Sequence, residues 1–362
     1  HATDSLTHMI HRRKFLASAA AVGSISGIAS RMIYAGPIPL TDDGNLRWRC
    51  DIVQMVPQDY GRRAPVVTGV SIQPNGNQIA IVGDDHYLCI YDFNHKTFVS
   101  QLKVHRDWVR VTRFSPDGKL LASAGNDRRL CIWDAGNLRQ PPAVHPHSSA
   151  IIDVDFSSDS SRLASVGFGS ELRIYDLPSG RIAHRMTCHC PDNHAVVFSR
   201  DDQLVAAGGR SGWIRVWNVG TGELVHQMRP HRQRIRSLAF TRNNEIVSCG
   251  EDRIVQITRL DDVDQPRTLT HDSAKLYDMQ LLDDGVLATC GSDNLIHIWR
   301  LEDNEPVGTL KGHLGTVSCL DFSNNRIASG GYDTQVRIWH YKKDFDPATR
   351  HTKLIRGWNK RG

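Results

Sequence analysis

The 362-residue sequence contains no run of about 20 uninterrupted apolar residues, so it offers no segment suited to a membrane-spanning helix. Cysteine is scarce, at eight residues, which excludes a fold built on disulfide bonds. The sequence also lacks the motifs of covalent haem sites, zinc proteases, esterase nucleophile turns and phosphate-binding loops. We therefore expect no enzyme activity, no metal and no cofactor. An enzyme whose catalytic residues are scattered along the chain would escape this search.

Positive charge is scarce in the body of the protein. The chain carries a net charge of +5, but residues 1–29 hold +2 and residues 340–362 hold +5, so the 310 residues between them are slightly acidic at −2. A general nucleic-acid-binding surface needs a basic stripe on the fold itself. The charge distribution therefore argues against nucleic acid as a partner.

Residues 1–35 have the layout of an export signal and linker. A basic stretch precedes residues 17–29, which carry no charge and are rich in small side chains. The basic stretch resembles the twin-arginine signals of bacteria, with Ala17 at a place where lysine is common. The matching residues are Arg12, Arg13, Phe15 and Leu16. Cleavage after Ala29 and cleavage after Ala35 are both compatible with the sequence.

This resemblance implies a periplasmic or envelope-associated protein that folds before it crosses the membrane, so free thiols are expected even after export. The alternative is a cytoplasmic protein that keeps these residues as a solvated N-terminal helix.

A repeat of about 41 residues organises the rest of the chain. An aromatic side chain ends a short β-rich run at six places, and Thr258 takes the same place in one more unit. The aromatic residues are Tyr91, Trp133, Tyr175, Trp217, Trp299 and Trp339, and the successive spacings, with Thr258 included, are 42, 42, 42, 41, 41 and 40. Such regularity indicates seven copies of one structural unit.

Each unit contains four short runs of alternating apolar and polar residues separated by turn residues, which predicts a four-stranded antiparallel sheet. A sheet of this kind has two apolar faces and must stack on copies of itself. We therefore predict an all-β fold over residues 46–340, a seven-bladed β-propeller of four-stranded antiparallel blades. The last blade lacks an outer strand, and we expect the N-terminal segment 46–52 to supply it and close the ring. The rival segment is 353–358.

The repeats resemble WD-repeats over about residues 46–340. In that family a His before the first strand, a Ser or Thr on the second, an Asp in the next turn and a Trp on the third form a buried hydrogen-bond network, as buried polar groups require. Three units carry the whole set. They are His105, Ser123, Asp127 and Trp133; His271, Thr289, Asp293 and Trp299; and His313, Ser329, Asp333 and Trp339. Units one and four retain the fewest of these residues, so we expect their blades to be the least rigid.

Cys188, His189 and Cys190 form the motif most suggestive of metal or redox chemistry. His189 falls on the repeat position of the structural His, and a Cys-x-Cys spacing lacks the usual two-residue gap between metal ligands. We therefore assign no metal site here. Redox activity of the two thiols is left open.

The resemblance also implies a binding surface. In the family, the start of each first strand and the residue before the turn Asp meet on one face around the central channel. Carried onto this sequence, the expected partner-binding residues are Trp108, Arg110, Phe168, His194, Arg210, Arg234, Arg236, Lys275, Tyr277 and Tyr332. Aromatic and arginine side chains are enriched in binding hot spots. Four of these residues, Arg210, Arg234, Arg236 and Lys275, are expected to form a basic arc. The plainer alternative is a set of solvated loop residues.

The tail, residues 341–362, is basic, and either rests on an anionic membrane surface or an acidic partner or is simply solvated. Our main hypothesis is a non-catalytic scaffold, monomeric on its own, that binds a protein or peptide of acidic character in the bacterial envelope. The alternative is an exported redox or hydrolytic enzyme subunit that uses the central channel.

Overall fold

The computed structural model describes residues 48–55, 63–74, 76–188, 191–270, 274–283, 285–302 and 306–340. The chain divides into two units, residues 1–34 and residues 35–362, and every described residue belongs to the second. The expected export signal (1–35) and basic tail (341–362) lie outside the described residues, as do His189, Cys190 and His271. The described part contains no helix that is long and apolar enough to cross a membrane.

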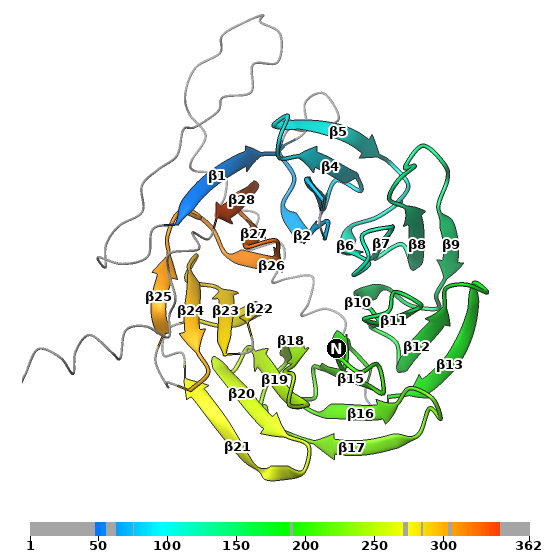
Figure 1. The fold of residues 1–362 in the computed structure, drawn as a ribbon, viewed down its shortest axis with the longest axis vertical. Helices are drawn as coiled ribbons and strands as arrows, with labels where there is room; N and C mark the ends of the chain where they lie inside the picture. Colours follow the sequence, from blue (N-terminus) through cyan, green and yellow to red (C-terminus); the bar gives the residue numbers. More distant parts are fainter. Residues whose placement is uncertain are drawn as a thin grey trace, which may run out of the picture. The chain divides into compact units, whose positions relative to one another are not determined.

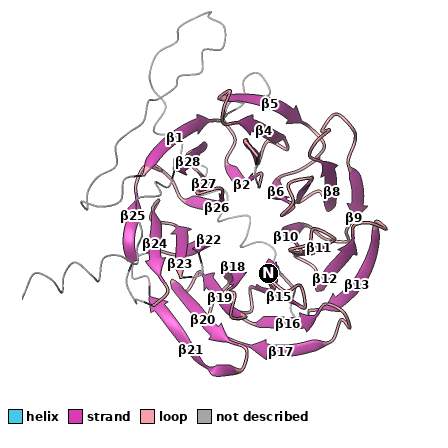
Figure 2. Ribbon diagram, viewed as in Figure 1, coloured by secondary structure: helices cyan, strands magenta, loops and turns pink. Residues whose placement is uncertain are grey.

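In the described part of the chain, twenty-eight strands form seven four-stranded antiparallel sheets, which confirms the predicted seven-bladed propeller. The sheets stand around a common axis with the first strand of each blade innermost (Figure 1), and the described chain outside them consists of turns and loops (Figure 2). Short segments of alternating polarity form these strands because one residue in two can then pack against a neighbouring blade.

The strands of the first four blades follow the chain in order. Blade 1 has β2 (Val67–Ile72), β3 (Gln78–Gly83), β4 (Leu88–Asp92) and β5 (Thr97–Leu102). Blade 2 has β6 (Val109–Phe114), β7 (Leu120–Gly125), β8 (Arg129–Asp134) and β9 (Ala143–Pro146). Blade 3 has β10 (Ile151–Phe156), β11 (Arg162–Gly167), β12 (Glu171–Asp176) and β13 (Arg181–Thr187). Blade 4 has β14 (Asn193–Phe198), β15 (Leu204–Gly209), β16 (Ile214–Asn218) and β17 (Leu224–Met228).

The remaining blades repeat this arrangement, and the last one uses the first strand of the chain. Blade 5 has β18 (Ile235–Phe240), β19 (Glu245–Gly250), β20 (Ile254–Arg259) and β21 (Asp262–Thr270). Blade 6 has β22 (Leu276–Asp283), β23 (Val286–Gly291), β24 (Ile296–Arg300) and β25 (Pro306–Leu310). Blade 7 has β26 (Val317–Ser323), β27 (Arg326–Gly331), β28 (Gln335–His340) and β1 (Arg49–Gln54).

The hydrophobic core lies between the blades. The described residues form seven clusters of buried side chains, and each cluster combines residues from two neighbouring blades. For example, Leu130 of blade 2 shares a cluster with Val154 and Tyr175 of blade 3. The blades therefore stabilise one another, because no single blade buries both of its faces.

The N-terminal strand β1 closes the ring, as predicted. It pairs antiparallel with β28, with Arg49 opposite His340 and Cys50 opposite Trp339. Trp48 and Cys50, 6% and 2% exposed, pack into the core between blades 6 and 7. The alternation of polarity along this segment matches that burial. The rival segment, residues 353–358, lies outside the described residues.

Candidate functional site

Every inner strand has a β-bulge at its second residue. The register of pairing between the first and second strands shifts at this point in all seven blades. A bulge leaves one residue unpaired and changes the direction of its side chain. Because the blades repeat around one axis, these residues form a ring on one face of the propeller, which we call the bulge ring. Its members are Thr68, Arg110, Ile152, His194, Arg236, Tyr277 and Ser318.

A glycine opposite each bulge allows a close approach of two backbones. A Cβ atom on Gly125 would lie 2.1 Å from the carbonyl oxygen of Trp108. The next residue, Asn126, donates its backbone N–H to that same oxygen at 2.9 Å. The residue before the turn Asp is thereby held beside the bulge residue. The equivalent glycines of the other blades are Gly83, Gly167, Gly209, Gly250, Gly291 and Gly331.

In blade 2 this arrangement fixes Arg110. Its Nε donates to Asn126 Oδ1 at 2.8 Å, and its guanidinium lies 4.9 Å from the centroid of the Trp108 ring. Burial lowers the pKa of Arg110. Tyr332 and Asp107 raise this pKa, and the like charge of Arg236 lowers it. Within the described part of the chain, no carboxylate forms a salt bridge with Arg110. Its charge is therefore partly desolvated, and no described carboxylate pairs with it.

In blade 5 the same arrangement fixes Arg236. Its guanidinium pairs with Glu251 and lies 5.1 Å from the centroid of the Tyr277 ring. Glu251 also lies 3.3 Å from Arg234 and 3.6 Å from Lys275. Burial raises the pKa of Glu251, but these cations, Arg236 foremost, lower it overall. One carboxylate thus holds three cations together.

Three of the four cations of the expected basic arc are therefore paired with carboxylates. Arg234, Arg236 and Lys275 share Glu251, and Arg234 also pairs with Asp192 at 2.9 Å. Arg210 is exposed, and no ion pair links it to another described residue. Sequence reasoning did not include Asp192 in the site. Asp192 directly precedes β14, as Arg234 and Lys275 directly precede their own inner strands. This shared repeat position could have identified Asp192 as a site residue.

His194 lies between two charged neighbours. Its Nε2 is 2.7 Å from Asp192 Oδ1, and its Nδ1 is 3.4 Å from Arg236 Nη1. Burial lowers the pKa of His194, Asp192 opposes that shift, and the charge of Arg236 adds to it. The Phe168 ring packs edge-on against the imidazole at 6.0 Å. Both ring nitrogens of His194 thus face charged neighbours, although the close contact of Nε2 with Asp192 lacks hydrogen-bond geometry.

Large exposed apolar side chains also occur on this face. Phe168 and Tyr332 are 44% and 45% exposed, and each directly follows the glycine opposite the bulge of its blade. Leu314 is 84% exposed and follows His313, where blades 2 and 5 carry Arg106 and Arg232. The sequence-based prediction did not include Leu314. An apolar residue at a repeat position where blades 2 and 5 carry arginine could have identified it. Trp108 and Tyr277 are half-buried against their arginines.

The hydrogen-bond network expected from the repeat pattern is complete in blades 2 and 7. In each of these blades, Asp, His, Ser and Trp side chains are linked in that order. His105 contacts Asp127 at 3.0 Å and Ser123 at 2.8 Å, and Trp133 donates to Ser123 at 3.1 Å. In blade 7, His313 contacts Asp333 and Ser329 at 2.9 and 2.8 Å, and Trp339 donates to Ser329 at 2.9 Å. In blade 6, Trp299 donates to Thr289 at 2.8 Å and Asp293 contacts His297.

Blades 1 and 5 each lack one or more of the network residues, and each contains a buried polar atom without a hydrogen-bond partner. In blade 5, Thr258 replaces the Trp, and its Oγ1 is buried without a hydrogen-bond partner. In blade 1, Arg63 stands at the repeat position of the network His, and Asp85 Oδ2 is likewise buried and unpartnered, while burial raises the pKa of that carboxyl. The expectation that blades 1 and 4 are the least rigid stays a prediction.

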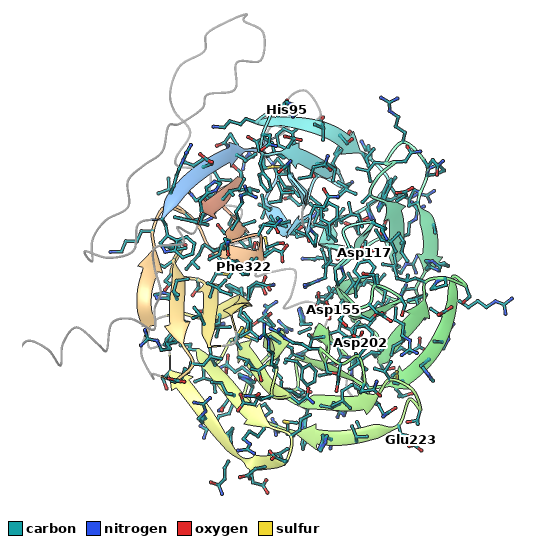
Figure 3. The ribbon with its side chains drawn as sticks, viewed as in Figure 1. His95, Asp117, Asp155, Asp202, Glu223 and Phe322 are labelled. Atoms are coloured by element: carbon teal, nitrogen blue, oxygen red, sulfur yellow. The ribbon has the colours of Figure 1, made fainter. Side chains whose placement is uncertain are left out.

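Substitution of Asp127 with Ala or Trp133 with Phe is expected to lower the free energy of unfolding by about 1–3 kcal/mol, because each leaves a buried polar partner unpaired. Urea denaturation measures the loss. The control is Glu223→Ala, at an exposed turn on the outer rim (Figure 3), which should change stability by less than about 0.5 kcal/mol. Equal effects of the three substitutions would contradict the role of the network.

A second charged group, which sequence reasoning missed, lies deeper along the inner strands. Arg113 Nη2 is 3.9 Å from Asp153 and its Nε is 3.8 Å from Asp155. Asp155 lies at the inner edge of the ring (Figure 3). Burial raises the pKa of Asp153 to about 7 and those of Asp155 and Asp278 to about 6, while Arg113 acts in the opposite direction on each.

These carboxylates also join the blades. Each accepts a backbone N–H from the inner strand of the next blade. The pairs are Val196 to Asp153 at 2.9 Å, Phe198 to Asp155 at 2.8 Å, Leu320 to Asp278 at 2.7 Å and Ile72 to Asp321 at 2.6 Å. Their function in the fold is therefore structural, because they bind neighbouring inner strands together.

The seven described cysteines are buried. Burial raises the pKa of Cys50 to about 11 and those of Cys89 and Cys131 to about 12, so these thiols are poor nucleophiles. Cys188 is buried, and its neighbours His189 and Cys190 lie outside the described residues. Among the described residues no group of three or more His, Cys, Asp or Glu side chains is arranged to hold a metal ion.

Comparison with known proteins agrees with the geometry. No curated protein matches the chain significantly. A model of the family described as WD40, WD domain, G-beta repeat, matches seven successive segments. They are residues 58–92, 96–134, 140–176, 180–218, 222–258, 264–300 and 304–340. The chain belongs to the WD40 repeat family.

Proposed function

We propose that this protein is a non-catalytic scaffold that binds a protein or peptide on the face bearing the bulge ring. WD40 propellers are commonly protein-interaction scaffolds. The observation that carries the proposal is the set of three exposed apolar side chains on this one face, namely Phe168, Leu314 and Tyr332. Exposed aromatic and aliphatic residues surrounded by polar residues are typical of binding surfaces.

The charges around these residues favour an acidic partner. Arg106, Arg210, Arg232 and Lys275 are exposed on the loops of this face. Arg234, Arg236 and Lys275 already pair with Asp192 or Glu251, so these three contribute less to the attraction than the sequence suggests. Exposed rim charges increase the association rate of a partner of opposite charge.

Photo-cross-linking in the native host tests this function. A photoreactive amino acid at Leu314 is expected to form an adduct with a specific polypeptide. The same amino acid at Val99, 47% exposed on the outer strand β5, is the matched control and should form none. Phe168→Asp is expected to weaken the adduct at least tenfold, because it places a carboxylate in the apolar part of the interface. Equal adducts at Leu314 and Val99, or none at Leu314, would contradict the proposal.

We also propose that the protein is exported to the bacterial envelope, on the strength of the Arg12-Arg13 motif alone. Cell fractionation with N-terminal sequencing of the mature chain tests this location. A mature chain that begins at Ser30 or Gly36 outside the cytoplasm supports export. A chain that keeps Arg12 and Arg13 in the cytoplasm contradicts it.

A further inference from the structure

Two of the seven members of the bulge ring are arginines, and they stand on opposite sides of the propeller axis. Arg110 belongs to β6 and Arg236 to β18, with blades 3 and 4 between them on one side and blades 6, 7 and 1 on the other. Figure 1 shows these two inner strands across the axis from each other. The ring itself contains no carboxylate, since its other members are Thr, Ile, His, Tyr and Ser.

Both guanidiniums are held in fixed positions before any ligand arrives. Arg110 is stacked on Trp108 and hydrogen-bonded to Asn126 at 2.8 Å. Arg236 is stacked on Tyr277 and bound to Glu251 and His194. Because their rotamers are already restricted, binding a ligand between them costs little side-chain entropy.

The two arginines also act on each other. The positive charge of Arg236 lowers the pKa of Arg110, and burial acts in the same direction. Arg110 has no salt bridge with any described carboxylate. An anion between the two arginines would offset this repulsion and give Arg110 a counterion.

The charges below the ring determine how far an anion can enter. Asp155 follows the bulge residue Ile152 by three positions, which places it about 10 Å farther along the strand. Asp321 likewise follows its bulge residue by three positions, whereas Asp153 and Asp278 directly follow theirs, and all four carboxyl groups interact with Arg113. A doubly charged phosphate would be repelled about twice as strongly as a singly charged carboxylate. The geometry thus favours a carboxylate that stays at the surface.

We propose that a carboxylate of the partner binds at the centre of this face, between Arg110 and Arg236. The carboxylate comes from an Asp or Glu side chain or from the C-terminus of the partner. This inference rests on the proposed function, because it assigns the chemical group that the partner places on the bulge ring.

Titration with short peptides tests the assignment on the full-length protein. The probes are acetyl-Gly-Glu-Gly-amide, acetyl-Gly-Gly-Gly with a free carboxyl terminus, the neutral acetyl-Gly-Gln-Gly-amide, and inorganic phosphate. Arginine Nε–H signals are followed by NMR and assigned from the spectra of Arg110→Gln and Arg236→Gln. We expect at least one carboxylate peptide to shift both signals saturably and the neutral peptide to shift neither. The peptide that binds identifies the source of the carboxylate.

Matched variants separate a built site from general attraction. Arg110→Gln and Arg236→Gln are each expected to weaken carboxylate binding at least tenfold. Arg106→Gln and Arg232→Gln remove the same charge from exposed positions on the same face and should weaken it less than twofold. Should Arg236→Gln fail to fold, Arg110→Gln and Arg110→Lys carry the test, with a smaller loss expected for lysine because it keeps the positive charge, although it cannot form the bidentate contact.

Three outcomes would overturn the inference. They are equal losses in all four glutamine variants, no saturable shift with either carboxylate peptide, and tighter binding of phosphate than of both peptides. In each of these cases a Leu314 adduct that still forms would leave the proposed function standing. Absence of that adduct together with saturable carboxylate binding would instead reject the protein partner and keep an anion site.

Discussion

Replacement of Gly125 by alanine is expected to lower the free energy of unfolding by about 3 kcal/mol. The new Cβ would lie 2.1 Å from the Trp108 carbonyl oxygen and 2.8 Å from the Val109 Cα, both of them backbone atoms. Neither atom can move without breaking the hydrogen bond from Asn126 or the pairing of β6 with β7. The bulge that orients Arg110 would be displaced at the same time.

Urea denaturation measures this loss, and Gly285→Ala is the matched control. A Cβ on Gly285 would have no heavy atom within 4 Å, so the same change should alter stability by less than about 1 kcal/mol there. A loss at Gly125 no larger than the loss at Gly285 would show that the close approach of the two backbones is not what requires glycine.

Replacement of Arg113 by methionine is expected to lower the free energy of unfolding by about 3 kcal/mol at pH 8, because it leaves a cluster of partly buried carboxylates without a counterion. Asp153 and Asp155 lie within 3.9 Å of the guanidinium, and Asp278 and Asp321 also interact with it. The Arg113 side chain is 32% exposed, so solvent screening keeps the loss at the lower end for a broken buried ion pair.

The loss should shrink as the pH falls from 8 to 5. The pKa of Asp153 is raised to about 7 and those of Asp155 and Asp278 to about 6, well above the value of about 3.9 in an unfolded chain. The folded state therefore binds more protons than the unfolded state between these pH values, and these groups favour folding more as the pH falls. Without Arg113 the folded pKa values rise further, so protonation relieves the variant more than the wild type.

Denaturation curves at pH 5 and pH 8 check this expectation, with Arg106→Met as the control. Arg106 is exposed on the same blade, and its loss should be small and independent of pH. The network carboxylates do not interfere in this range. Burial raises the pKa of Asp127 and of Asp333, but the contacts with His105 and His313 lower it overall, so their contribution is lost only in stronger acid. A pH-independent deficit in Arg113→Met would contradict the argument.

The sequence predicted the propeller correctly because its evidence is periodic. Six aromatic residues and Thr258 recur at intervals of 40 to 42 residues, and a repeated unit with two apolar faces has few ways to bury both. The same reasoning identified β1 as the closing strand. The last unit lacked an outer strand, and the segment around Trp48 and Cys50 had the alternating polarity of a strand that could fill this place. It also named the His, Ser, Asp and Trp side chains that are hydrogen-bonded in blades 2 and 7.

The candidate site was only partly predictable. The repeat position placed Arg110, Arg234 and Arg236 on one face, but it did not show that Asp192 and Glu251 neutralise two of them. It likewise missed Leu314, whose exposure depends on a loop rather than on a strand pattern. Charge read along a sequence takes no account of distances between residues that are 40 positions apart.

Fold class, blade number, closing strand and network residues were all predictable from the sequence, because each of these depends on a local pattern and its repetition. The set of charges that meet around the axis, in contrast, followed only from the folded structure. The bulges appear in the register of paired strands, and the position of Arg110 opposite Arg236, like that of Arg113 among four carboxylates, follows from closing seven blades into a ring. Electrostatic energy depends on distance in space, and ring closure sets that distance.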